Sequence, residues 1–312
     1  MPKFDVTIAG EINLDIILYG LPEDLPLERE LLADGCAVTL GSSSAITAHN
    51  LSMLGSHVGF VTRVGRDSLG EIALGRLQTA GVDISKITHS TGSDTGLTIV
   101  LQHAPRRHML TYPGCMAEMR YEDLDLAYLT SARHFHLSSF FLHRALRDRI
   151  PELFRQLKLA GLTISFDSND DPDDQWGGNL HEALRYVDLL MPNEREACKL
   201  AGRNSFEDAL AALGEKIPTV VVKMGSRGAM AVQKGKHYQA PALAVEVVDP
   251  VGAGDTFNAG FLNEYLRGSD LPTCLASGTL AAAFSTTRAG GTEAFREAGY
   301  WQQFRQQYRV SK

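Results

Sequence analysis

The sequence has few cysteines, no basic cluster and no long apolar segment. Its four cysteines lie far apart without a CxxC pair, which disfavours a disulfide framework or a zinc site and predicts reduced, buried thiols in a cytoplasmic protein. The net charge of −7 and the lack of a Lys/Arg run argue against nucleic acid and anionic membrane surfaces as partners. No apolar run approaches the ~20 residues that span a bilayer, and no GxGxxG motif follows the first apolar run, which disfavours a nicotinamide-dependent dehydrogenase.

Apolar, strand-like runs alternate with helix-like periods over most of the 312 residues. This alternation predicts an α/β fold, a mostly parallel sheet with helices on both faces, in one domain over residues 1–312. We expect strands at 6–9, 58–64, 134–137, 163–167, 189–192, 219–224 and 229–232, helices at 45–54, 69–80, 150–160, 194–201 and 206–213, and a largely helical part from Phe257 onward that includes 276–287.

Two segments break this alternation. Residues 12–18 and 96–112 read as short alternating strands separated by turn residues, and no helix follows either of them promptly. They predict a small antiparallel sheet that stands off the main body as a lid, built from about residues 12–20 and 96–113.

The most informative stretch is DPVGAGDTFNAGFL at 249–262, in which Gly252, Ala253 and Gly254 lead into Asp255 and an apolar, helix-compatible segment. Such a turn leaves backbone N–H groups unpaired at a helix start, where the helix dipole adds positive charge, so an anion can bind there. A carboxylate beside that site is suited to take a proton from a hydroxyl that attacks a bound phosphoryl group. Taken alone, the motif is also explained by a glycine-rich turn capped by an acid.

Other polar clusters fall where strands are expected to end, and ligands of open α/β sheets bind beyond the carboxyl ends of the strands. In GEINLD, Asn13 and Asp15 lie on one side of an extended segment, as two hydroxyl-recognising groups do, although a solvated turn explains the pair as well. In GSSSAITAHN, Gly41 and Ser42 let a ligand approach the backbone closely, and a serine among 42–44 is expected to cap the following helix.

Three further motifs suggest a nucleotide and a metal. FDSNDDPDDQW at 166–176 starts like an EF-hand but lacks its glycine and glutamate, which excludes calcium there and leaves Asn169 as a contact to phosphate or metal-bound water. In MPNEREA, Asn193 and Glu196 either form a capping box or hold a hydrated Mg²⁺. In VVKMGSRGAM, Gly225 and Gly228 flank a turn that is either a hairpin or a surface for a nucleotide.

Together these motifs resemble the ribokinase-like (PfkB) family of carbohydrate and nucleoside kinases, in the family's order and over nearly the whole chain. The segment at 61–83 is similar to the family's strand–GxDxxG–helix–GVD block, PNEREA to its NxxE motif and 249–262 to its C-terminal signature. The resemblance implies a Rossmann-like domain with a β-sheet lid that forms a dimer contact in many members. It implies phosphoryl transfer from MgATP to a hydroxyl of a small sugar or sugar-like substrate. A nucleoside acceptor and a non-catalytic ligand-binding homologue are the alternatives.

The resemblance also implies roles for individual residues. Asp255 would be the general base beside an anion hole formed by Gly252, Ala253 and Gly254. Glu196 would hold Mg²⁺ through water. The remaining implied contacts are Asn13, Asp15, Gly41 and Ser42 to the substrate; Asn169, Asn193, Lys223, Gly225, Gly228 and Thr279 to the nucleotide; and Asp249, Val251 and Gly290 to a monovalent cation such as K⁺, partly through backbone carbonyls.

The chain departs from the family's pattern at two positions. Ile46 stands where the GGxxxN block carries an asparagine, so an apolar group replaces an amide that reads a hydroxyl, and we expect an altered substrate preference. Asp171 stands where the DxNxR variant carries arginine, which disfavours a strongly anionic substrate.

Overall fold

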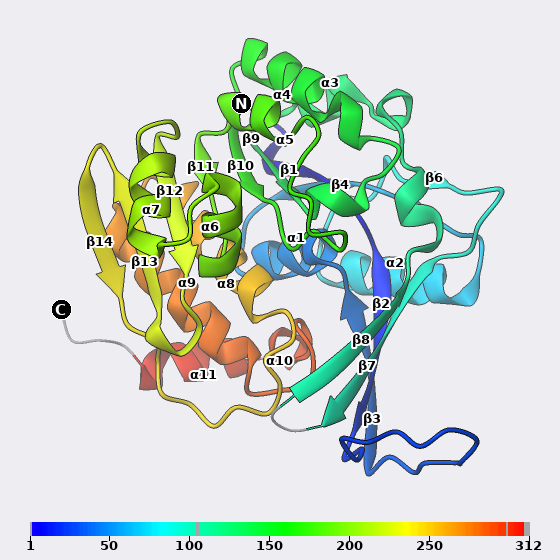
Figure 1. Cartoon of the computed structure of the whole chain (residues 1–312). Coiled ribbons are helices and arrows are strands. Elements are labelled where there is room, and N and C mark those ends of the chain that lie inside the picture. Colours follow the sequence, from blue (N-terminus) through cyan, green and yellow to red (C-terminus); the bar gives the residue numbers. More distant parts are fainter. Residues whose placement is uncertain (1, 104–105, 298, 309–312) are drawn as a thin grey trace.

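The main sheet has eight strands in the order β14-β13-β12-β11-β10-β9-β1-β4 in the computed structural model, which describes residues 2–103, 106–297 and 299–308 (Figure 1). Neighbouring strands from β4 through β12 are parallel, and β12, β13 and β14 are antiparallel. The strands are β1 (Phe4–Ala9), β4 (Val58–Val61), β9 (Ala132–Ser138), β10 (Thr163–Asp167), β11 (Leu189–Leu190), β12 (Thr219–Lys223), β13 (Ala229–Gln233) and β14 (Lys236–Ala240).

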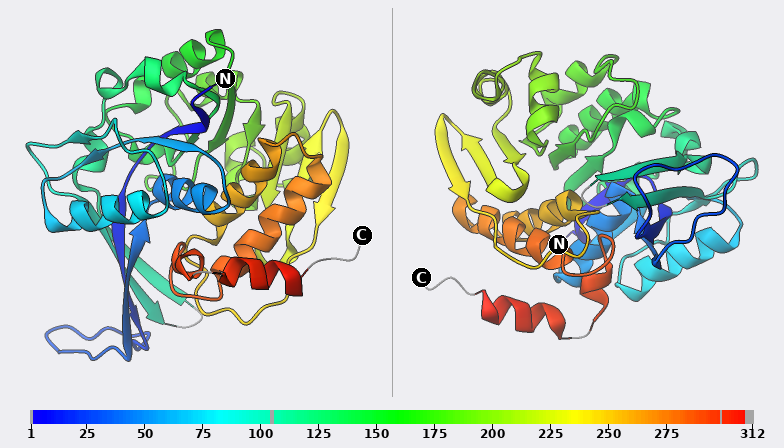
Figure 2. Two further views of the ribbon diagram at one scale, coloured as in Figure 1. Left: turned by 180° about the vertical axis from the view of Figure 1, so that it is seen from behind. Right: turned by 60° about the horizontal axis from the view of Figure 1, so that its bottom comes forward.

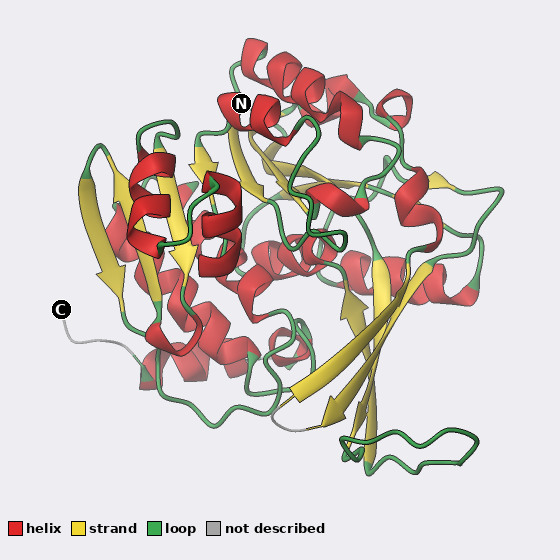
Figure 3. Ribbon diagram, in the orientation of Figure 1, coloured by secondary structure: helices red, strands yellow, loops and turns green. Residues whose placement is uncertain are grey.

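Helices cover both faces of this sheet, so nearly all side chains of its parallel strands are buried (Figure 3). Side chains of β12 alternate between the two cores, with Val221 in one and Val220 and Val222 in the other. One face carries α1 (Ser43–Met53), α2 (Ser68–Thr79), α8 (Ala253–Tyr265) and α9 (Leu271–Ser285), seen from behind in Figure 2. The other carries α3 (Leu126–Leu129), α4 (Ile150–Leu159), α5 (Leu180–Ala183), α6 (Glu194–Ala201) and α7 (Phe206–Gly214), while α10 (Glu293–Arg296) and α11 (Tyr300–Gln307) pack against Phe284 of α9.

A second, four-stranded sheet in the order β3-β2-β7-β8 projects from the main body. The expectation of an antiparallel sheet is wrong for its centre, because β2 and β7 both leave the main body in the same direction and pair in parallel. The outer pairs are antiparallel, and strand β3 was not predicted. The strands are β2 (Asn13–Tyr19), β3 (Gly35–Gly41), β7 (Gly96–His103) and β8 (Arg106–Tyr112).

The α/β architecture is as predicted, with differences at the ends of elements. The strand expected at 58–64 breaks after Val61, and β5 (Arg63–Val64) pairs instead with β6 (Thr88–His89) in a small sheet. Cys115 and Cys274 are buried as expected, whereas the expectation is wrong for Cys36, which is exposed on the lid strand β3, and for Cys198, which is half-buried on α6. Within the described ranges, no helix is both long and apolar enough to cross a membrane.

Candidate active site

The GAGD turn begins helix α8 with unpaired backbone donors. Gly252 has a left-handed backbone with φ 73°, and a Cβ at this position would lie 2.5 Å from the Cα of Gly291, so the turn requires glycine. The N–H groups of Gly254 and Asp255 have no protein acceptor among the described residues. The turn therefore presents free donors at the positive end of the α8 dipole, which is the environment that an anion requires.

Asp255 lies in the first turn of α8 and is partly exposed. Burial raises the pKa of its carboxyl group to about 7, against the opposing effect of the Lys223 ammonium, while the nearby carboxylate of Asp167 raises that pKa further. A carboxyl group with a pKa near neutrality is well matched to accept a proton at physiological pH.

Lys223 ends β12 and forms an ion pair with Asp167, which ends β10. The two strands carry these side chains to the same carboxyl edge of the sheet, beside Gly254. Asn258, one turn along α8 from Gly254, donates a 2.6 Å hydrogen bond from Nδ2 to Oδ2 of Asp167.

A cavity of about 540 Å³ opens beside the GAGD turn. It brings together four residues that the sequence analysis assigned to a nucleotide, Lys223, Gly225, Gly228 and Thr279. The hairpin expected at 221–230 is also present, because β12 and β13 are antiparallel neighbours joined by a short 3₁₀ turn. Apolar side chains line most of the remaining wall, among them Leu243, Val245, Val247, Pro250 and Phe257.

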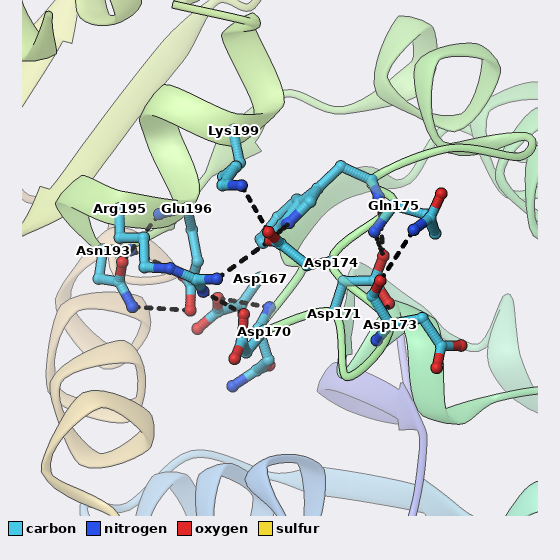
Figure 4. Close-up of polar contacts among 12 residues, drawn as sticks. Asp167, Asp170, Asp171, Asp173, Asp174, Gln175, Asn193, Arg195, Glu196 and Lys199 are labelled. Carbon is cyan, nitrogen blue, oxygen red and sulfur yellow. Dashed lines mark hydrogen bonds and ion pairs between the residues drawn. The ribbon is translucent and has the colours of Figure 1, made fainter. Parts of the chain in front are cut away.

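Asn193 and Glu196 form a capping box at the start of α6, visible in Figure 4. The Asn193 N–H donates to Glu196 Oε2 at 2.8 Å, and the Glu196 N–H donates to Asn193 Oδ1 at 2.9 Å. Burial, together with the charge of Asp167, raises the pKa of Glu196. The capping interpretation is thus correct, and it holds the Glu196 carboxylate near the Asp167–Lys223 pair.

The acidic loop after β10 is fastened to α6 by ion pairs (Figure 4). Arg195 pairs with Asp170 and, at 3.1 Å, with Asp174, whose carboxylate also lies 2.8 Å from the Lys199 ammonium. Asp171, the residue in place of the family's arginine, is buried and accepts hydrogen bonds from backbone N–H groups within its own loop. Its carboxylate therefore organises the loop.

The proposed substrate contacts converge where the lid meets the main body. Asn13 and Asp15 lie on one side of β2 as predicted, since a Cβ at Gly41 would stand 2.3 Å from Asn13 Oδ1 and 2.1 Å from Asp15 Oδ1. Burial raises the pKa of Asp15 to about 7, and the carboxylates of Asp255 and Asp249 raise it further. The lid strand thus places Asp15 close enough to Asp255 for the two carboxyl groups to interact electrostatically.

The expectation that a serine among 42–44 caps helix α1 is wrong. Ser42 makes no capping bond, because its backbone is left-handed at φ 68° and its hydroxyl donates to Asn13 Oδ1 at 2.8 Å. Ser44 does not cap either, since its N–H and hydroxyl donate to the buried carboxylate of Glu11, at 3.1 and 2.6 Å. Glu11 was not predicted as a site residue, although it lies two residues after the first predicted strand, at 6–9.

Asn169 does not line the 540 Å³ cavity. Its left-handed backbone, φ 52°, turns the side chain toward the start of α1. There its Oδ1 accepts a 2.9 Å hydrogen bond from the Ser139 N–H and its Nδ2 donates to Ser43 Oγ at 2.9 Å. The contact of Asn169 to phosphate or metal-bound water stays a prediction.

Asp249, Val251 and Gly290 do come together. The Asp249 carboxylate accepts hydrogen bonds from the N–H groups of Val251 at 2.9 Å and Gly290 at 3.0 Å, and from the lid side chains of Tyr19 and Gln102. The backbone carbonyl oxygens of these three residues accept no hydrogen bond within the described chain. Carbonyl oxygens, rather than the occupied carboxylate, are thus the available donors for a cation.

Ile46 lies behind the GAGD turn and does not offer an apolar surface to a substrate. Its side chain is 2% exposed, and its Cδ1 would stand 3.2 Å from a Cβ at Gly252 and 3.0 Å from one at Gly291. The residue therefore fills space beneath the turn.

Sequence reasoning missed Asp167, Asn258, Tyr19 and Gln102. Asp167 ends a correctly predicted strand, which was an available signal, and Asn258 lies within the GAGD signature itself. Tyr19 and Gln102 gave no signal, because only the folded lid brings them to Asp249.

Known proteins resemble this chain over most of its length. The model of the pfkB family of carbohydrate kinases matches residues 5–298. An ATP-dependent ribose-1-phosphate kinase of Halopiger xanaduensis is 30% identical over 292 residues, which cover 93% of this chain and 94% of that protein. A cytidine kinase of Thermococcus kodakarensis is 27% identical over 282 residues, 88% of this chain and 93% of that protein.

The solved structures extend the likeness to the fold. A ribokinase-II-like protein of E. coli, solved with ATP and Mg²⁺, is 25% identical with a TM-score of 0.86, and the match covers 98% of this chain and 100% of that one. Fold and relatives together define a phosphotransferase that acts on an alcohol group, a sugar or nucleoside kinase. The chain belongs to the pfkB family of carbohydrate kinases.

Proposed function

We propose that the protein transfers the γ-phosphoryl group of MgATP to a hydroxyl of a small sugar or sugar-like substrate. The observation that carries this proposal is that the free N–H groups of Gly254 and Asp255 and the carboxyl group of Asp255 lie in one turn, whose residues Ala253 and Gly254 line a cavity of about 540 Å³. Asn13, Asp15, Gly41 and Ser42 lie on the lid side of this turn, where they would hold the acceptor.

In the proposed reaction Asp255 takes the proton of the acceptor hydroxyl. The hydroxyl oxygen then forms a bond to the γ-phosphorus while the bond from that phosphorus to the β-phosphate oxygen breaks, and ADP leaves. The N–H groups of Gly254 and Asp255 are free to donate to the phosphoryl oxygens as charge develops on them, whereas that of Ala253 already donates to the Pro250 carbonyl oxygen at 3.2 Å. Proximity and charge neutralisation supply most of the acceleration in reactions of this kind.

The start of α6 fits a hydrated Mg²⁺, because Glu196 offers a carboxylate close to the Lys223 end of the cavity. Asn193 holds that carboxylate in place through the capping box. When bound, Mg²⁺ neutralises the phosphates of the nucleotide and orients them.

Replacement of Asp255 by asparagine tests the assignment. We expect Asp255→Asn to keep its fold and ATP affinity, by circular dichroism and calorimetry, while kcat falls by roughly 10²–10⁴, the usual loss for a general base. Asp24→Asn, in an exposed loop, serves as the control. Turnover of Asp255→Asn close to that of the wild type would refute the proposed role.

The acceptor class is tested by thermal-shift screening of sugars against nucleosides. An apolar Ile46 facing the substrate would favour a nucleoside base, but Ile46 is buried behind the turn and offers no such contact. We therefore expect sugars to raise the unfolding temperature of the protein. A rise with nucleosides alone would overturn the proposal that the acceptor is a sugar. Absence of ATP consumption over a broad acceptor panel would instead favour a non-catalytic ligand-binding protein.

We also propose that residues 1–312 form one catalytic domain, with the β3-β2-β7-β8 sheet as a lid that pairs two subunits. Met109, Leu110 and Tyr112 on β8 are large apolar or aromatic side chains that are exposed along the lid. The expected dimer is measured by light scattering, and Leu110→Glu is expected to make it monomeric. Leu159→Glu, on the exposed end of α4, is the matched control, and a monomeric wild type would exclude the dimer.

A monovalent cation is the last part of the proposal. The free carbonyl oxygens of Asp249, Val251 and Gly290 support K⁺ beside the 252–254 turn, since hard cations prefer oxygen donors. We expect kcat/KM to rise on replacing tetramethylammonium by K⁺ at constant ionic strength. Equal rates in the two salts would remove K⁺ from the proposal.

A further inference from the structure

Lys223 is a nearly buried cation at the anion-binding turn. Its side chain is 13% exposed, and the carboxylate of Asp167 with which it pairs is fully buried. The lysine stem runs along the start of α8, because its Cδ and Nζ would each lie 3.8 Å from a Cβ placed on Gly254. The ammonium therefore lies next to the residue whose N–H is free to bind a phosphoryl oxygen.

The ammonium keeps one N–H for a ligand. An ammonium group has three N–H donors. One is directed to Asp167, and a second points to Oδ1 of Asn258 at 3.5 Å. No further acceptor for Lys223 exists among the described residues, and the side chain forms part of the wall of the 540 Å³ cavity.

Two neighbouring groups fix this orientation. The amide of Asn258 links the pair, because its Nδ2 donates to the Asp167 oxygen that receives the lysine, while its Oδ1 faces the ammonium. Asp167 itself is held by the backbone N–H of Asn169, which donates to its other carboxylate oxygen at 3.3 Å. The lysine is thus positioned before any ligand arrives.

We propose that Lys223 is a catalytic residue whose ammonium donates to the phosphoryl group in transfer, with Asp167 and Asn258 as positioning residues. This inference rests on the proposed kinase reaction. As the acceptor oxygen bonds to the γ-phosphorus and the bond to the β-phosphate oxygen breaks, the free N–H of Lys223 stabilises the charge on the oxygens involved. Lys223 keeps its proton throughout, and the proton of the acceptor goes to Asp255.

The electrostatic surroundings keep the lysine charged. Burial lowers the pKa of Lys223, but the carboxylates of Asp167 and Glu196 outweigh that effect and leave the pKa above its ordinary value. Conversely, the Lys223 charge lowers the pKa of Asp255. A purely structural ion pair would need neither the free donor nor the cavity position, and buried pairs add little to stability over apolar residues of similar size.

The test is Lys223→Met in the full-length enzyme, with an acceptor on which the wild type is active. We expect kcat to fall by about 10²–10³, the loss found when one oxyanion donor is removed, while the dissociation constant for MgATP changes by less than about threefold, or ~0.7 kcal/mol. The acid limb of the pH profile of kcat/KM should move to higher pH, because Asp255 loses the cation that lowers its pKa.

Lys223→Met leaves Asp167 buried without its partner and is at risk of misfolding. The double variant Lys223→Met/Asp167→Asn removes both charges, and it is expected to fold while its kcat stays low. Lys223→Cys treated with bromoethylamine restores an ammonium at nearly the same distance, and we expect it to recover activity. Identically treated wild type controls for Cys36, which is exposed, and Cys198, which is half-buried.

The outcomes separate this inference from the kinase proposal. A folded variant without the ammonium that turns over within about threefold of the wild type, less than ~0.7 kcal/mol, overturns the role of Lys223 only. The same holds if aminoethylation of Lys223→Cys restores stability without restoring kcat. Failure of the wild type to phosphorylate any acceptor would instead overturn the kinase proposal on which the inference rests.

Discussion

The hydroxyl of Tyr19, on the lid strand β2, donates a 3.1 Å hydrogen bond to the carboxylate of Asp249, just before the GAGD turn. Gln102, on the neighbouring lid strand β7, makes a longer contact of 3.4 Å to the same carboxylate. The lid is thus joined to the segment that leads into the anion-binding turn, so the position of the lid and the geometry of the turn are physically linked.

Removing that hydroxyl should loosen the lid. We expect Tyr19→Phe to raise the KM for the acceptor by about tenfold, equivalent to ~1.4 kcal/mol, close to the lower end of the range for a hydrogen bond to a charged group. The KM for ATP should stay nearly constant, since Tyr19 does not line the nucleotide cavity. Steady-state kinetics measure both KM values, and Tyr112→Phe on the exposed lid strand β8 is the control. An unchanged acceptor KM would show that the contact does not hold the lid.

Activity should depend on pH through Asp255, whose pKa burial raises to about 7. A general base works only when ionised, so kcat/KM is expected to fall as the pH drops below about 7. The contribution of Asp255 to the free energy of unfolding changes with pH in the opposite direction to activity. Between the unfolded value of 3.8 and about 7, the folded state holds a proton that the unfolded state has lost, so this group lowers stability as the pH rises.

Thermal unfolding of Asp255→Asn beside the wild type measures this contribution together with the part of the Asp15 pKa shift that the Asp255 charge causes. The variant should gain Tm relative to the wild type as the pH rises from about 4 to 7, and the difference should level off above that range. A difference that does not vary with pH would mean that the pKa of Asp255 is not raised in the folded state.

Gly41 should tolerate no side chain. Its Cβ would stand 2.1 Å from Asp15 Oδ1 and 2.3 Å from Asn13 Oδ1, so Gly41→Ala must displace both groups. We expect the acceptor KM to rise by at least about tenfold, ~1.4 kcal/mol, with ATP binding retained by calorimetry. Gly75→Ala, where the Cβ meets nothing within 4 Å on α2, is the matched control. Normal acceptor kinetics in Gly41→Ala would separate Asn13 and Asp15 from substrate binding.

The Mg²⁺ requirement should respond to Glu196. Gln preserves the capping box, because its side chain can still accept from the Asn193 N–H, so Glu196→Gln is expected to fold normally. Loss of the negative charge should raise the Mg²⁺ concentration for half-maximal activity several-fold. Titration of activity with Mg²⁺ at fixed ATP measures this, and Glu194→Gln at the neighbouring position is the control. An unaltered titration would leave Glu196 with a capping role only.

Much of the fold could be predicted because its signals are local. Strands such as β4 and β12 are short apolar runs, and helices such as α4, α6 and α7 are amphipathic, so each expected element from β1 to β13 has a counterpart. The lid was harder to predict, since β3 alternates only weakly and the direction of β2 relative to β7 depends on how both leave the main body. The cap expected from a serine among 42–44 also failed, because Ser44 bonds to Glu11 and Ser42 to Asn13, contacts that a local pattern does not reveal.

The sequence by itself determined the α/β architecture, the glycine-rich turn and the acid that follows it, because periodicity and the conformational freedom of glycine act over a few neighbouring residues. Only the tertiary structure decided that Lys223, Asp167 and Asn258 meet beside that turn, that Tyr19 reaches Asp249, and that Ile46 lies behind the turn. These contacts join residues far apart in the chain, and their distances depend on how strands and helices pack, which no short segment encodes.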